Sequence, residues 1–153
     1  ERDEVADIFI AAGKIVAIGQ GPADFHANRT LDASGLIVCP GLVDLSVRLR
    51  EPGYEYKATL ESEMLAAAAG GITSLACPPD GRPPLDEPGL VERLVRRTAD
   101  AGLARVLPVG ALTVGLKGEA LAELGSLARA GCVAFSQGSN SPIVDTQVLL
   151  RAL

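Results

Sequence analysis

The sequence predicts an α/β protein built on a parallel sheet, and three observations support this class. From Gly41 onward a unit recurs, made of a helical pattern, a glycine, a short apolar strand and a loop. The glycines at positions 71, 102 and 131, which end the helical patterns, lie 31 and 29 residues apart. The 153 residues are 48% hydrophobic, which is enough apolar side chain for a buried core. Helices and strands that alternate at this spacing are typical of βαβ units, whose strands pair in parallel.

The first forty residues are expected to form strands of a small β-domain. Four short stretches there have the composition of strands: residues 6–11, 14–19, 29–33 and 36–39. Ala12-Gly13 separates the first two and Ser34-Gly35 the last two, so the pattern predicts two hairpins. Because Pro40-Gly41 interrupts the pattern, we expect two domains, residues 1–40 and residues 41–153.

The repeat itself predicts four strands and four helices. We expect the strands at residues 42–49, 72–77, 104–111 and 132–136. Glu61 and Glu63 fit the first turn of the first helix, where the helix dipole favours anions. Pro88 suits the start of the second helix. A fourth helix is predicted from near Asp145 to Leu153.

Two architectures fit such a repeat, an open doubly wound sheet and a closed barrel of eight strands. The open sheet usually carries a glycine-rich nucleotide loop after its first strand, whereas residues 50–54 here read R-E-P-G-Y. We therefore predict the first half of a (β/α)8 barrel, with about four of its eight units. A whole barrel needs about 250 residues, and half of one exposes two strand edges. We expect a fragment or partial chain, or a half that another chain completes.

Charge and composition exclude several functions. The net charge of −5 argues against a nucleic-acid partner, which requires a basic face. No apolar run approaches the roughly 20 residues that span a bilayer, so no membrane partner and a cytoplasmic location are expected. Cys39, Cys77 and Cys132 form no C-x-x-C pair, and we interpret them as buried thiols of a reducing compartment. His26 is the single histidine and lies in a polar stretch, as expected for a solvated loop residue.

Several motifs resemble those of dihydroorotase, a cyclic amidohydrolase of pyrimidine biosynthesis. They are C-P-G-L-V-D-L-S-V-R-L-R-E-P-G at 39–53, A-A-A-A-G-G-I-T-S at 66–74, P-V-G-A-L-T-V-G-L-K-G-E at 108–119 and A-G-C-V-A-F-S at 130–136. The resemblance extends over nearly the whole chain. It implies an amidohydrolase-type barrel that follows strands of a small β-sandwich domain. It also implies a zinc site at the carboxyl ends of the barrel strands.

The residues that the resemblance assigns to the metal differ in this chain. The family's H-x-H at the end of the first barrel strand corresponds to Ser46 and Arg48, and its acidic ligand after the fourth strand corresponds to Gln137. Serine is a poor zinc ligand, a guanidinium has no lone pair to donate, and a neutral amide does not offset the metal charge. We therefore expect no zinc and no other cofactor, although active relatives use zinc.

Of the two positions that the resemblance assigns to substrate binding, one differs from the family and one is kept. The family's substrate-binding asparagine corresponds to Asp80, whose charge would repel the carboxylate of dihydroorotate. Arg50 keeps the family's substrate-carboxylate arginine, and it is either a ligand-binding residue or part of a loop ion pair. Arg48 is expected to point into the former metal cavity and pair with Asp44 or Asp80, or to reach solvent. The loop with Tyr54 and Tyr56 is either ordinary surface or an anchor for a partner.

These differences predict a dihydroorotase-like protein that has lost catalysis. The resemblance offers a structural role, as a partner of aspartate carbamoyltransferase, the preceding pyrimidine enzyme. One alternative is an active metal-dependent cyclic amidohydrolase with a rewired site, completed by a C-terminal half with carboxylate ligands or a carbamylated lysine. Lys117 is a poor candidate for that lysine because it lies in the G-L-K-G loop. A second alternative is a half-barrel that self-associates.

Overall fold

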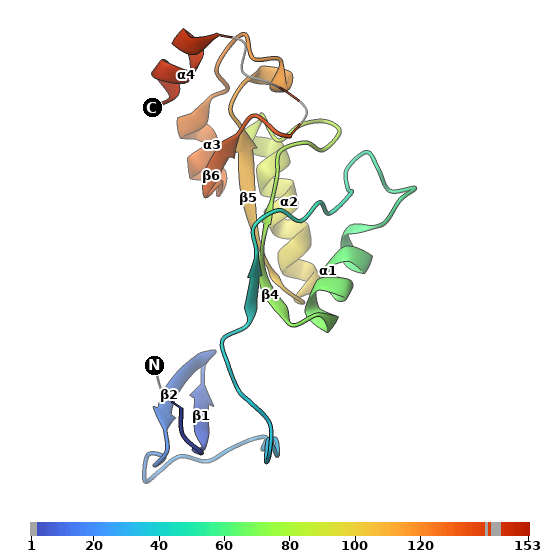
Figure 1. Ribbon diagram of the computed structural model, residues 1–153. Coiled ribbons are helices and arrows are strands. Elements are labelled where there is room, and N and C mark those ends of the chain that lie inside the picture. The colour runs from blue at the N-terminus through green and yellow to red at the C-terminus, as the bar shows by residue number, and fades with distance from the viewer. Residues whose placement is uncertain (1–2, 140, 142–144) are drawn as a thin grey trace. The chain divides into compact units, whose positions relative to one another are not determined.

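The computed structural model describes residues 3–139, 141 and 145–153, which belong to two compact units (Figure 1). The first unit comprises Glu1–Cys39 and the second Pro40–Leu153. No helix in the described part of the chain has the length and hydropathy needed to cross a bilayer.

The N-terminal unit contains one antiparallel hairpin. Strand β1 (Ile8–Ala11) pairs with β2 (Lys14–Ile18), as the sequence predicts. The intervening Ala12 and Gly13 both have positive φ, at 49° and 73°, which gives the turn the twist that a two-residue hairpin needs. Phe9 packs edge-on against Phe25, with ring centroids 5.2 Å apart.

The prediction of a second hairpin around Ser34-Gly35 is wrong. The turn is present, since Leu36 N donates to Ala33 O at 3.0 Å and Ser34 N to the Asp32 carboxylate at 2.9 Å. The flanking residues form no strand in the described part of this unit. Ile37 is 93% exposed, so these residues bury no apolar face that would fix a register.

The C-terminal unit is a parallel sheet of four strands, each followed along the chain by a helix (Figure 1). The strands, in spatial and chain order, are β3 (Leu42–Asp44), β4 (Ile72–Cys77), β5 (Arg105–Ala111) and β6 (Ala134–Ser136). The helices are α1 (Leu60–Ala69), α2 (Pro88–Ala101), α3 (Leu124–Ala130) and α4 (Thr146–Ala152), with a 3-10 turn, η1 (Val114–Leu116), after β5.

The strand order decides between the two architectures that fit the repeat. Neighbouring strands follow one another in the sequence without the reversal that defines a doubly wound sheet. Helix α1 contacts α2, and α2 contacts α3, so these helices line the same face of the sheet. This arrangement is that of the first half of a (β/α)8 barrel and confirms the predicted fold class.

The core of this unit lies between the sheet and its first two helices. Leu60 and Met64 of α1 pack with Leu75 of β4, and all three side chains are fully buried. Thr59 begins α1 with a capping box: its hydroxyl accepts from Ser62 N, and the Ser62 hydroxyl accepts from Thr59 N. Gly102 ends α2 in the left-handed region, at φ 62°.

Strand β3 ends five residues earlier than predicted. The Asp44 carboxylate accepts a hydrogen bond from Ser46 N at 2.9 Å, which turns the backbone away from the ladder. One further backbone contact, Val47 N to Ala76 O at 2.9 Å, returns the chain to the edge of β4. Residues 45–49 therefore form an irregular segment at the carboxyl end of β3.

Candidate functional site

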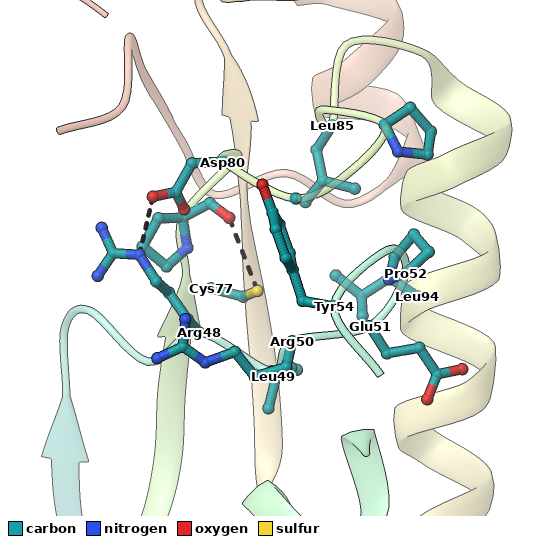
Figure 2. Close-up of a pocket in the computed structure, with 13 residues that line it drawn as sticks. Arg48, Leu49, Arg50, Glu51, Pro52, Tyr54, Cys77, Asp80, Leu85 and Leu94 are labelled. Atoms are coloured by element: carbon teal, nitrogen blue, oxygen red, sulfur yellow. Dashed lines mark hydrogen bonds and ion pairs between the residues drawn. The ribbon is translucent and has the colours of Figure 1, made fainter. Parts of the chain in front are cut away.

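The segments that follow β3 and β4 border a small cavity. Its volume is about 50 Å³, the space of a few water molecules at roughly 10–15 Å³ each. Figure 2 shows its lining, which combines apolar side chains with two arginines, two carboxylates, a thiol and a tyrosine: Leu49, Leu85, Arg48, Arg50, Glu51, Asp80, Cys77 and Tyr54. The cavity thus contains several of the residues that sequence reasoning assigned to the site.

Arg48 forms an ion pair with Asp80. Its Nε donates to Asp80 Oδ2 at 2.8 Å (Figure 2), and its Nη2 donates to Ser139 Oγ at 3.0 Å. The side chains of Arg48 and Asp80 are 35% and 24% exposed. Of the partners that the sequence left open, Asp80 is the one observed, since the Asp44 carboxylate is turned to Ser46 N.

Arg50 lies on the cavity wall in a left-handed backbone conformation, at φ 63°. Its carbonyl oxygen accepts from Tyr54 N at 2.8 Å, which closes the turn of the R-E-P-G segment. Its side chain forms no ion pair with the residues that the structure describes. The loop ion pair belongs instead to the next residue, Glu51.

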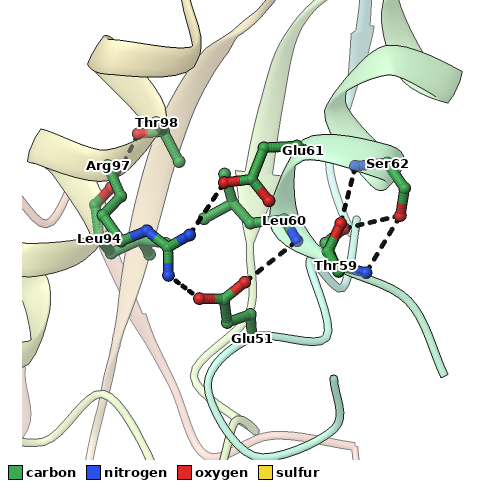
Figure 3. A network of polar contacts seen from close by, with 8 residues as sticks. All are labelled: Glu51, Thr59, Leu60, Glu61, Ser62, Leu94, Arg97 and Thr98. Carbon is green, nitrogen blue, oxygen red and sulfur yellow. Dashed lines mark hydrogen bonds and ion pairs between the residues drawn. The ribbon is translucent and has the colours of Figure 1, made fainter. Parts of the chain in front are cut away.

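Glu51 ties this loop to two helices (Figure 3). Its carboxylate contacts the Arg97 guanidinium of α2 and accepts from Leu60 N, at the start of α1, at 3.3 Å. Arg97 also donates to Glu61 Oε1 at 2.9 Å. The Glu51 side chain is only 11% exposed, so its charge depends on these partners. Sequence reasoning missed this role, because no local signal links residues 46 positions apart.

The loop after β3 and the loop after β4 fit closely together. Arg82 N donates to Pro52 O at 3.1 Å, and both the Glu51-Pro52 and Arg82-Pro83 peptide bonds are cis. Gly53 has φ 98°, and a Cβ built on it would lie 2.3 Å from Arg82 O. The glycine of R-E-P-G is therefore needed both for its backbone conformation and for the approach of the second loop.

Gln137 is buried after β6 and organises the turn after β5. Its Oε1 accepts from Thr113 Oγ1 at 2.8 Å, and its Nε2 donates to Leu116 O at 3.0 Å. Thr113 Oγ1 in turn accepts from Gly118 N at 2.9 Å. Both ends of the amide are thus engaged within the protein, which sequence reasoning did not foresee.

Neither buried thiol of the described chain is an activated nucleophile. Burial raises the pKa of the Cys77 thiol, which contacts the Pro78 carbonyl, and raises the pKa of Cys132 to about 11. Cys39 is exposed, contrary to the prediction that all three thiols are buried, because the residues before it form no packed strand. His26 is exposed in the N-terminal unit, and Lys117 is exposed beside η1.

The donors at the expected metal positions do not fit zinc. Ser46 is exposed, the Arg48 guanidinium is cationic and paired, and both polar atoms of the Gln137 amide are hydrogen-bonded. Within residues 3–139, 141 and 145–153, no group of three His, Cys, Asp or Glu side chains is placed to hold a metal. At residue 48, where a zinc site of this type would require an imidazole ligand, the protein has an arginine that is ion-paired with Asp80.

The half-barrel matches part of an amidohydrolase-type barrel. Residues 35–149 match the family described as dihydro-orotase-like, and the chain belongs to this family. It is 56% identical to a dihydroorotase-like protein of Pseudomonas aeruginosa over 153 residues, which are all of this chain and 36% of that protein. It is 46% identical to a dihydroorotase of Pelobacter propionicus over 151 residues, which are 99% of this chain and 35% of that protein.

A solved structure supports the same assignment. The chain superposes on the L-hydantoinase (dihydropyrimidinase) of Arthrobacter aurescens with a TM-score of 0.70 and 27% identity. The match covers 96% of this chain and 33% of the hydantoinase. The chain therefore spans about a third of the length of the relatives and of the structure that it resembles.

Proposed function

We propose that the intact protein is a non-catalytic member of the dihydroorotase-like family that serves pyrimidine biosynthesis as a structural partner of aspartate carbamoyltransferase. The observation that carries the proposal is the Arg48–Asp80 ion pair, 2.8 Å long, between the irregular segment after the first barrel strand and the loop after the second. A guanidinium at this position supplies a positive charge and no lone pair, so it opposes a metal instead of binding one.

The chemistry of cyclic amide hydrolysis explains why the loss of a metal site would abolish activity. A bound metal would lower the pKa of water from about 16 to about 7 and so supply hydroxide at neutral pH. Ser46, Arg48 and Gln137 do not supply that metal site. The buried thiols, whose pKa values are raised, are poor replacements for the nucleophile. We therefore derive no hydrolytic step from the described residues.

The shape of the unit, in contrast, is maintained. The helix caps, the core between α1 and the sheet, and the R-E-P-G loop with its Glu51 anchor all hold the strand ends in place. A barrel that keeps its shape without its metal ligands supports a role in which another protein uses its surface. The choice of aspartate carbamoyltransferase rests on the family resemblance.

We expect the intact protein, dialysed against metal-free buffer, to contain no stoichiometric zinc and to hydrolyse no dihydroorotate above the buffer rate. Elemental analysis and an absorbance assay measure the two quantities. The double variant Ser46→His, Arg48→His is expected to remain inactive, because Gln137 and Asp80 are unchanged. Turnover by the unmodified protein with bound zinc would instead support the active amidohydrolase with a rewired site.

We expect the intact protein to co-elute with its cognate aspartate carbamoyltransferase after co-expression. Size-exclusion chromatography with light scattering gives the mass of the complex and also reveals self-association. Tyr56, 79% exposed beside Lys57, is the first position to vary. If Tyr56 is an anchor, Tyr56→Ala should weaken binding roughly 30-fold, whereas Arg96→Ala on the exposed side of α2 should not. Separate elution of a transferase that is fully assembled and active alone would contradict the proposal.

A further inference from the structure

The Arg48 guanidinium connects two loops that the sheet itself leaves apart. Asp80 lies in the loop after β4, next to β3, but Ser139 lies in the loop after β6, at the other end of the strand order. No backbone ladder joins β3 to β6. The contact between Arg48 and Ser139 therefore crosses the carboxyl edge of the curled sheet from its first strand to its fourth.

The simultaneous contacts of residue 48 with Asp80 and Ser139 depend on an arginine side chain. Nε and Nη2 are separate donors of one planar fork, and they serve Asp80 and Ser139 respectively. A lysine at residue 48 would present one compact charge and could not hold both partners in this arrangement. Asp80 is only 24% exposed and forms no other ion pair among the described residues. Its carboxylate would therefore be left half-buried and uncompensated without Arg48.

We propose that Arg48 is a built-in cation that joins the loops after β4 and β6 across the carboxyl edge of the sheet, so that this edge is held together without a bound metal. Arg48 is thus a positioning residue for both loops. The inference deepens the proposed function, because it assigns a structural task to the residue that stands at a former ligand position. It also predicts that a chelator leaves the order of these loops unchanged.

The test is a double-mutant cycle on the intact protein. Arg48→Met, Asp80→Asn and the double variant are compared with the unmodified protein by denaturant unfolding. We expect the two substitutions to be coupled by roughly three- to tenfold in the unfolding equilibrium constant, as for a partly buried pair. Arg96→Met and Asp100→Asn, which replace exposed charges four residues apart on α2, are the matched controls and should be coupled at most about twofold, as for a solvent-exposed helix pair. Additive effects of Arg48→Met and Asp80→Asn would overturn the proposal.

Hydrogen exchange adds a local measurement that a general loss of stability would not reproduce. Arg48→Met should speed amide exchange both in residues 78–86, after β4, and in residues 137–139, after β6. Ser139→Ala should speed exchange only in residues 137–139. Arg48→Lys, a milder change, should keep the coupling to Asp80 and lose the protection around Ser139. Unchanged exchange in both loops, or loss of protection on adding EDTA to the unmodified protein, would contradict the inference. Neither measurement involves the transferase, so its outcome is independent of the test of complex formation.

Discussion

Gly53→Ala is expected to lower the free energy of unfolding of the intact protein by about 3 kcal/mol. An L-residue with a side chain costs about 1–2 kcal/mol in the left-handed region, and Gly53 has φ 98°. The new Cβ would also lie 2.3 Å from the Arg82 carbonyl oxygen, a backbone atom that cannot rotate away. The two loops would have to separate and lose the hydrogen bond from Arg82 N to Pro52 O, worth about 1 kcal/mol.

A second glycine allows the cost of the backbone conformation to be measured without the cost of the clash between the loops. Gly71 has φ 78°, but a Cβ built on it meets no atom within 4 Å. Gly71→Ala should therefore cost only about 1–2 kcal/mol, the conformational part. Denaturant unfolding of both variants gives the difference. Equal destabilisation would mean that the loops after β3 and β4 are not held in close contact at Gly53.

Patterns local to the sequence predicted the regular part of the fold. The glycines near 71, 102 and 131 end helices because they adopt conformations that other residues avoid, and this preference acts within one turn. The spacing of the units then follows, and with it the parallel sheet. The Ala12-Gly13 turn was predictable for the same reason. The second hairpin was not, because a strand also needs a partner, and residues 29–39 have none in the described unit.

Side-chain contacts over long sequence separations limited the prediction of the site. Alternation along a strand suggested that Arg48 faces the carboxyl edge, and Asp80 was one of its two candidate partners. The early end of β3 was missed, because it depends on the Asp44 carboxylate accepting from a neighbouring amide. The contacts of Glu51 with Arg97, and of Gln137 with Thr113 and Leu116, involve residues that meet only after the sheet has formed.

Gln137→Asp, which introduces the acid that the resemblance to dihydroorotases implies for this position, is expected to destabilise the intact protein by about 2–3 kcal/mol at pH 7. A carboxylate lacks the N–H that now donates to the part-buried Leu116 O, and leaving a buried acceptor unsatisfied costs about 1–3 kcal/mol. Leu116 itself has φ 57°, a strained conformation for leucine that the Gln137 amide helps to hold. The charge would also be desolvated, since residue 137 is 8% exposed.

The pH dependence identifies the cause of this loss. Burial beside a carbonyl oxygen should raise the pKa of the new carboxyl in the folded protein above its unfolded value. The protonated variant is then destabilised less, so the loss should be smaller at pH 5 than at pH 7 and should grow as pH rises through the folded pKa. Gln137→Glu keeps the side-chain length and should show the same trend, whereas exposed Gln20→Glu should show none. A loss independent of pH would indicate altered packing as its cause. Gln137→Asp should also leave the protein inactive, because an acid at residue 137, with Ser46 and the paired Arg48 unchanged, still supplies none of the imidazoles of a zinc site.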